Sequence, residues 1–173
     1  MLKKFLIVIF CLFPSTVFAE NVVKGLNGYN KIVIDFTKNA DRCELEGANA
    51  YVAHLREKLA GIGISEKQDS NVSLRLQLGG TPLGMLDGQC AVAANLSVET
   101  VLHAKNVRAN DRQVQMAIDR AGSFEVTLYN TGAFAVSSQV YKHIDGKSKS
   151  LVQWKLREII ERLAAKLNVA RQT

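Results

Sequence analysis

The sequence predicts an α+β fold: a mostly antiparallel sheet of four to six strands with two amphipathic helices packed on one face. Two observations predict it. Residues 44–61 and 150–169 repeat apolar side chains at spacings of three and four, as amphipathic helices do. The segments between them are rich in β-branched residues or alternate apolar with polar residues, as strands do. The expected order of elements is β-α-β-β-β-(β)-α.

The amino-terminal end has the features of an export signal. Lys3 and Lys4 form a basic start, and the apolar run that follows is too short to cross a bilayer comfortably. A small residue, Ala19, then stands before a plausible cleavage point. We therefore expect residues 1–19 to be a signal peptide and residues 20–173 to form one mature domain. The expected location is the periplasm, with secretion as the alternative.

The charge balance points away from nucleic acid. Removing the signal takes away two lysines and no acid, so the formal net charge falls from +6 to +4, with 20 bases against 16 acids. This mild excess fits weak attraction to anionic envelope polymers and leaves peripheral contact with a membrane open, but it is no basic stripe. The aromatic residues Phe36, Phe124 and Phe134 are expected to face the core.

Two cysteines remain in the mature chain, Cys43 and Cys90, and we expect them to form a disulfide. Closing this loop would stabilise the fold by about 3–4 kcal/mol in the chain-entropy model. A redox or metal role is the alternative, but there is no C-x-x-C motif. The three histidines, His54, His103 and His143, are not at metal-ligand spacing either. We expect no metal and no cofactor.

The front half is expected to begin with a strand and a helix. Residues 31–36 (KIVIDF) are nearly all apolar, which predicts a strand buried on both faces. The helix over 44–61 would start after a cap at Asp41 and end in a left-handed cap at Gly61. Its buried face is expected to carry Leu45, Ala48, Val52, Leu55 and Leu59.

A half-buried strand and a glycine loop follow. Residues 72–78 alternate cleanly, with four apolar side chains on one face and three polar ones on the other. Residues 79–88 hold four glycines and a proline, which predicts a loop without a phosphate-binding motif. Its apolar residues form a candidate binding tip if they are exposed. They are Pro82, Leu83, Met85 and Leu86.

Residues 91–103 alternate again and predict the next strand. Residues 112–119 fit either a helix or a strand; we choose a strand, because a turn at 121–123 would then pair it with residues 124–129. Residues 132–137 are expected to form one more short strand.

The closing helix over 150–169 carries the second candidate site. Its buried stripe is expected to comprise Val152, Leu156, Ile159, Ile160, Leu163 and Leu167. Trp154 falls nearly opposite this stripe, close to Leu151 and Lys155. Either the segment 139–149 covers the tryptophan, or it anchors a partner protein or a membrane surface.

No catalytic set is evident. There is no G-x-S-x-G motif, no free cysteine if the disulfide forms, and no convergent histidine cluster. We therefore expect a non-enzymatic exported protein that binds another envelope protein or assists envelope assembly. The alternative is a small-molecule or lipid carrier with a pocket between the helix at 44–61 and the sheet. A hydrolase built on one of the three histidines is a third hypothesis.

Overall fold

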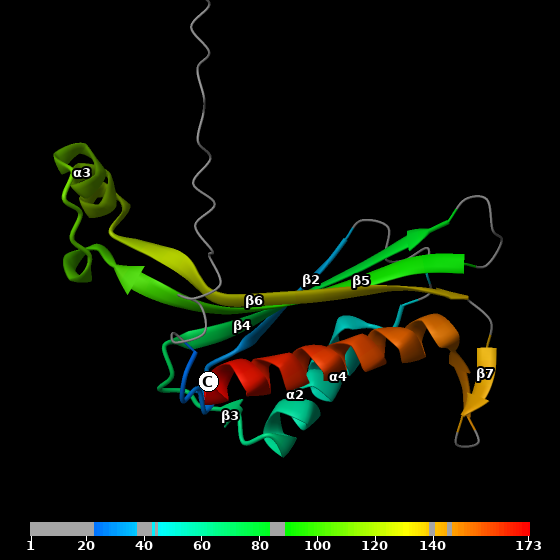
Figure 1. Ribbon diagram of the computed structural model, residues 1–173. Helices are drawn as coiled ribbons and strands as arrows, with labels where there is room; N and C mark the ends of the chain where they lie inside the picture. Colours follow the sequence, from blue (N-terminus) through cyan, green and yellow to red (C-terminus); the bar gives the residue numbers. More distant parts are fainter. Residues whose placement is uncertain (1–22, 38–42, 44, 84–88, 139–140, 145–146) are drawn as a thin grey trace, which may run out of the picture.

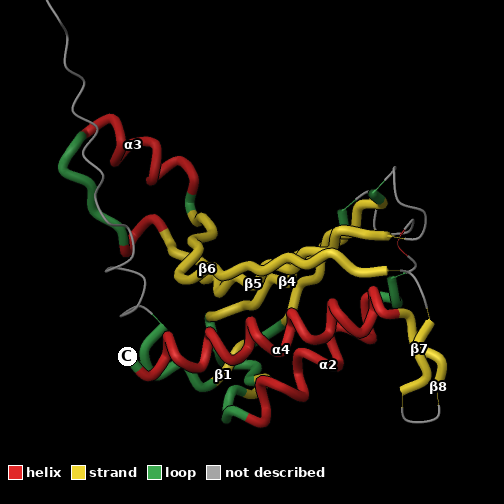
Figure 2. The backbone as a smooth tube through the Cα atoms, turned by 45° about the vertical axis from the view of Figure 1, so that its right-hand side comes forward, coloured by secondary structure: helices red, strands yellow, loops and turns green. Residues whose placement is uncertain are grey.

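The computed structural model describes residues 23–37, 43, 45–83, 89–138, 141–144 and 147–173. They form two layers, a mixed sheet of four strands and a layer of helices (Figure 1), which confirms the predicted α+β class. The helices α2 (Ala48–Gly61) and α4 (Leu151–Gln172) lie on the same side of the sheet in both Figure 1 and Figure 2. In the described ranges, no helix is long and apolar enough to span a bilayer.

The main sheet has the strand order β2-β4-β5-β6. Its strands are β2 (Ile32–Phe36), β4 (Val72–Pro82), β5 (Gln89–His103) and β6 (Ser123–Ser138). Two small sheets are formed by β1 (Gly28–Tyr29) with β3 (Ser65–Glu66), and by β7 (Tyr141–Ile144) with β8 (Lys147–Ser150).

The pairing follows from the connections. The strands β2 and β4 are parallel, because α2 lies between them in the chain and makes the crossover that parallel strands require. The strands β4, β5 and β6 are antiparallel neighbours. We expected β2 to be buried on both faces, and this is wrong: its residues are half-buried, and Phe36 is 37% exposed. The reason is that β2 is an edge strand with one open face.

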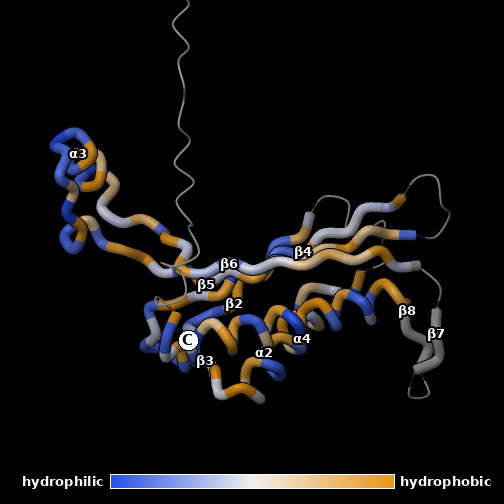
Figure 3. Tube along the Cα trace, in the orientation of Figure 1, coloured by the Kyte–Doolittle hydropathy of each residue, from blue (hydrophilic) through white to orange (hydrophobic). Residues whose placement is uncertain are grey.

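The core lies between the sheet and the helix layer. Alternate residues in the middle of β4 and β5, including Leu76 and Leu96, point toward the helices and are buried. The predicted stripe of α4 is confirmed, since all six of its residues are buried. Figure 3 shows apolar and polar residues alternating along α4, as expected of an amphipathic helix.

The front helix differs from the prediction at both ends. It begins at Ala48 rather than at residue 44, after Gly47, which supplies no side-chain cap. The left-handed residue beyond its end is Gly63, with φ of 78°, and not Gly61. The predicted cap Asp41 lies outside the described residues. The buried side chains of α2 are Tyr51, Leu55 and Leu59. Of the five residues predicted for its buried face, Leu55 and Leu59 are therefore fully buried.

The predicted glycine loop is shorter than expected. Residues 79–82 continue β4 and pair with residues 90–93 of β5. A side chain at position 80 would be crowded, because Gly80 lies against the disulfide. A Cβ added to Gly80 would come within 3.1 Å of the Cys43 Cβ. Of the predicted apolar tip, Pro82 and Leu83 are half-buried, and Met85 and Leu86 lie outside the described residues.

The region 112–119 is a helix and not a strand. The helix α3 (Arg112–Ala121) begins at Asp111, whose carboxylate accepts hydrogen bonds from the backbone N–H groups of Gln113 and Val114. It follows a short 3₁₀ helix, η2 (Ala104–Asn106), and both lie at the far end of the β5–β6 hairpin (Figure 2). Because α3 occupies the tip, the predicted turn at 121–123 joins this helix to β6.

The two short strands predicted over 124–129 and 132–137 are one strand of 16 residues, β6. It pairs with β5 along its whole length, with one register shift between Val98 and Glu99. The predicted disulfide is present: the Cys43 and Cys90 sulfur atoms are 2.10 Å apart and both residues are fully buried. It joins the segment before α2 to the start of β5. Such a bond indicates an exported protein.

Candidate functional site

One face of the main sheet is left uncovered by the elements described. The helices α2 and α4 cover the other face, and we call the uncovered side the open face (Figure 1). It consists of the alternate residues of β2, β4, β5 and β6 that point away from the helices. When one face of a sheet packs on the core and the other is exposed to solvent, the exposed face normally carries polar residues. The open face departs from this rule at one end, and this end is the candidate site.

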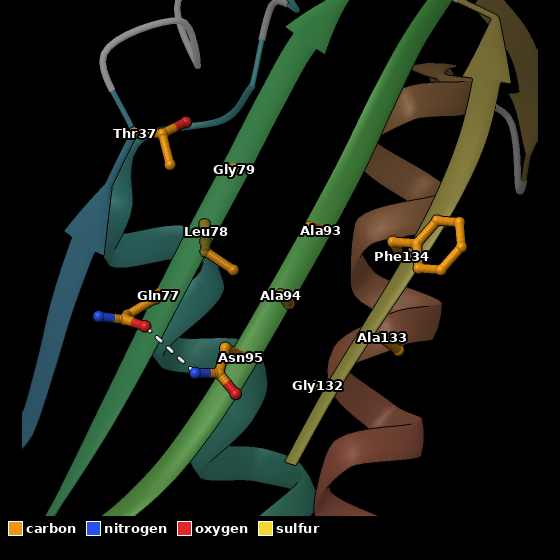
Figure 4. A pocket seen from close by; sticks show the side chains of 10 residues that line it. All are labelled: Thr37, Gln77, Leu78, Gly79, Ala93, Ala94, Asn95, Gly132, Ala133 and Phe134. Carbon is orange, nitrogen blue, oxygen red and sulfur yellow. Dashed lines mark hydrogen bonds between the residues drawn. The ribbon is translucent and has the colours of Figure 1, made fainter. Parts of the chain in front are cut away.

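A groove of about 380 Å³ lies on this end of the open face. Its floor includes Gly79 beside Ala93 and Gly132 beside Asn95, whose side-chain amide donates to the Gln77 side chain at 3.2 Å. Phe134 of β6 rises along one side of the floor, as Figure 4 shows. The groove exists because neither glycine has a side chain to fill it.

Phe134 is 81% exposed, and its neighbour on the same face, Val136, is 56% exposed. The expectation that Phe134 faces the core is therefore wrong, whereas Phe124 is half-buried. The alternating partners of Phe134 are Ala133 and Ala135, which pack against the core on the helix side. Over residues 133–136 of this strand, the two alanines face inward, where α4 comes close, and the two larger residues face outward.

The other end of the open face is polar and internally satisfied. Arg75 of β4 donates to Asp35 of β2 at 2.8 Å and to Glu99 of β5 at 2.9 Å. Ser97 donates to the same Glu99 carboxylate, also at 2.9 Å. The hydrogen bonds to Asp35 and Glu99 raise the pKa of Arg75, so its guanidinium stays charged. The alternation in the sequence predicted that Arg75 lies on the solvent-exposed face of the sheet. It did not predict the hydrogen-bond partners of Arg75, which belong to other strands.

The second candidate site surrounds Trp154 on α4. Its side chain is 44% exposed, so the described residues do not bury it. The Lys155 Nζ lies 5.6 Å from the centre of the Trp154 ring and also binds Glu158 at 2.7 Å. The Lys155 hydrogen bond is the main cause that lowers the pKa of Glu158. Leu151 is half-buried. Contact of this patch with a partner stays a prediction.

The histidines do not come together. His54 lies between α2 and α4, with 10% of its side chain exposed and its Nε2 atom 3.3 Å from a Glu161 carboxylate oxygen. That contact lacks hydrogen-bond geometry. Burial, followed by the nearby Arg157 charge, lowers the pKa of His54. His103 ends β5, and the side chain of His143 lies outside the described residues. Within the part of the chain described, no group of histidine, cysteine, aspartate and glutamate could hold a metal.

The place expected for a carrier pocket is filled. Tyr51, Leu55 and Leu59 of α2 are fully buried against the core. The phenol of Tyr51 accepts a hydrogen bond from the Glu46 backbone N–H, and burial raises its pKa to about 12. These side chains occupy space between α2 and the sheet, where the carrier hypothesis placed its pocket.

No protein family model matches the chain, and no curated protein matches it. Among solved structures, the chain is similar to the rare lipoprotein B from Shewanella oneidensis, with 10% sequence identity and a TM-score of 0.31. The match covers 80% of this chain and 90% of that one. A TM-score this low establishes no common fold.

Proposed function

We propose that this exported protein is a non-enzymatic binding protein, which recognises another envelope protein through the apolar end of the open face. The observation that carries the proposal is Phe134, a phenylalanine that is 81% exposed beside an apolar groove. Large aromatic side chains next to shallow pockets are typical anchors of protein interfaces.

Neighbouring residues extend this apolar surface. Val136 lies on the same face, and the strands beside Phe134 contribute Ala93 and Gly79. Contiguous exposed apolar surface of this kind is unusual on a protein that works alone and often marks an interaction site. The polar end of the open face supports the same proposal, because Arg75 and Glu99 are already bonded to each other and to neighbours. The part of the open face that can bind an apolar partner is therefore the end that carries Phe134.

The test is a site-specific photo-crosslink in cells that produce the protein. A benzophenone amino acid replaces Phe134 in one variant and Val114 in a matched control, since Val114 is 50% exposed but lies on α3, away from the groove. We expect a discrete crosslinked protein from position 134 and none from position 114. Equal crosslinking from both positions, or none from either, would contradict the proposal.

Trp154 gives a second arm of the same experiment. The variant Trp154→Ala is combined with the crosslinker at position 134. If the tryptophan patch belongs to the same interface, the crosslink weakens. An unchanged crosslink would remove Trp154, Leu151 and Lys155 from the proposed interface without affecting the role of Phe134.

A further inference from the structure

The strand β6 lies at one edge of the main sheet. In the strand order of the main sheet β6 comes last, so its outer side meets no other strand among the elements that the structure describes. From Tyr129 to Ser138 it pairs with β5 without interruption. A long regular edge strand offers a row of unpaired backbone N–H and C=O groups.

The two edges of the sheet differ in protection. Natural proteins usually block a free edge with a short strand, a charge or a proline. The edge formed by β2 has these features, since β2 spans five residues and carries Asp35, and β4 ends beyond it at Pro82. In β6, by contrast, no charged residue and no proline follows Glu125. Lys166, whose Nζ donates to the Gly132 carbonyl, is the charged contact that the described residues make to β6 here. An edge of this length with so little protection can pair with another chain.

Exposed apolar residues flank the β6 edge on both faces of the sheet. Phe134 and Val136 lie on the open face. On the helix side, a groove of about 280 Å³ runs between Tyr129 of β6 and the last turns of α4, where Val169 is 61% exposed. A strand beside β6 would direct its alternate side chains to these two faces. One added strand would therefore direct side chains toward both apolar surfaces.

We propose that the β6 edge binds an extended segment of another protein, which joins the sheet as a further strand. This inference rests on the proposed function, because it names how the partner of the Phe134 surface binds. Backbone hydrogen bonds to β6 would give affinity, and the two apolar faces would select alternating apolar side chains in the partner.

The charge at the helix-side groove favours a different protein over a second copy of this chain. Lys166 lines this groove, and its Nζ donates to the Gly132 carbonyl of β6 at 3.4 Å. No ion pair is found for it within the described ranges, so an acidic side chain on the incoming strand would be complementary. Pairing between the 129–138 segments of two copies would bring no acidic strand residue to this place, because this part of β6 carries none.

The experiment selects peptides and then blocks their backbones. A phage-displayed library of random linear peptides is panned on the exported chain, and enriched peptides are synthesised unmodified and with N-methyl groups on alternate amides. We expect alternating apolar residues with an acid. N-methylation of one set of alternate amides should weaken binding at least about tenfold, because several hydrogen bonds are lost, and the other set should have little effect. The β6 amides should gain protection from hydrogen exchange.

The other outcomes are distinguishable. If binding requires Phe134 but tolerates N-methylation of either set, the strand-addition inference fails and the proposed function survives. If no peptide is enriched, or protection appears away from β6, the inference is overturned, and the crosslink from position 134 decides the proposed function separately. Protection of β6 in the free protein, together with a dimeric mass, would overturn it in favour of a second copy.

Discussion

The two faces of the main sheet use the same strands for different purposes. Toward the helices, Leu76 and Leu96 are fully buried in one continuous core. On the open face of the same sheet, Phe134 and Val136 remain in water. Burial of the first kind stabilises the fold, while exposure of the second kind contributes nothing to it. The difference shows which side chains the fold requires and which ones need another explanation.

The largest effect is expected from the disulfide, which lies on the helix side. Replacing Cys43 and Cys90 together by alanine should lower the free energy of unfolding by about 4 kcal/mol in the chain-entropy model, because the bond closes a loop of 47 residues. Urea unfolding of the double variant measures this. A loss below about 1 kcal/mol would mean that the bond is not part of what holds the two layers together.

A pair of substitutions compares the faces directly. Leu96→Ala leaves a cavity between the sheet and α4, so we expect it to lower the free energy of unfolding by about 2–5 kcal/mol. Phe134→Ala removes a larger side chain from water and should change it by about 0.5 kcal/mol or less. Denaturant unfolding of the two variants under identical conditions gives both values. Similar losses would show that something covers Phe134.

The adjacent glycines of β4 repeat the comparison on a smaller scale. In Gly80→Ala the new Cβ would come within 3.1 Å of the Cys43 Cβ and 3.2 Å of its sulfur, so we expect destabilisation by about 1–3 kcal/mol. In Gly79→Ala the nearest atom is a Thr37 methyl at 3.4 Å, so stability should be nearly unchanged. The second variant should instead weaken peptide binding, because it fills the groove floor.

The sequence predicted the helix side of the molecule better than the open side. Periodicity located the α4 stripe and the inner residues of β4 and β5, because burial demands apolar residues at regular spacing. The same logic placed Phe134 inside, since it assigns the larger residue of an Ala-Phe-Ala-Val run to the core. In the structure β6 and α4 lie so close together that the alanines face the core and Phe134 faces outward. This closeness depends on tertiary packing, which the local pattern does not contain.

Features that depend on residues close together in the sequence could be predicted, whereas those that depend on strand order could not. The pattern at 112–119 was compatible with a strand, and the deciding residue was Asp111, whose side chain caps the helix. That signal was available in the sequence. The bonds of Arg75 to Asp35 and Glu99 were not, because they join residues 40 and 24 positions apart whose neighbourhood depends on strand order.

The smallest expected effect concerns His54 in the helix layer. Because burial lowers its pKa in the folded protein, the unfolded chain, with a histidine pKa near 6.5, binds the proton first as the pH falls. The free energy of unfolding should therefore decrease as the pH falls from about 6.5 to the folded-state pKa of His54. Above about pH 6.5 this group should have no effect on stability. Urea midpoints measured between about pH 7.5 and pH 5.5 test this, above the range where most carboxylates titrate.

The variant His54→Gln supplies the control for this pH dependence. Glutamine cannot take up the proton, so the decrease between these two pH values should become smaller than in the unmodified protein, even if the variant is less stable throughout. The comparison is between slopes and not between absolute stabilities, which separates titration from lost packing. An unchanged slope would assign the acid sensitivity to groups other than the buried histidine between α2 and α4.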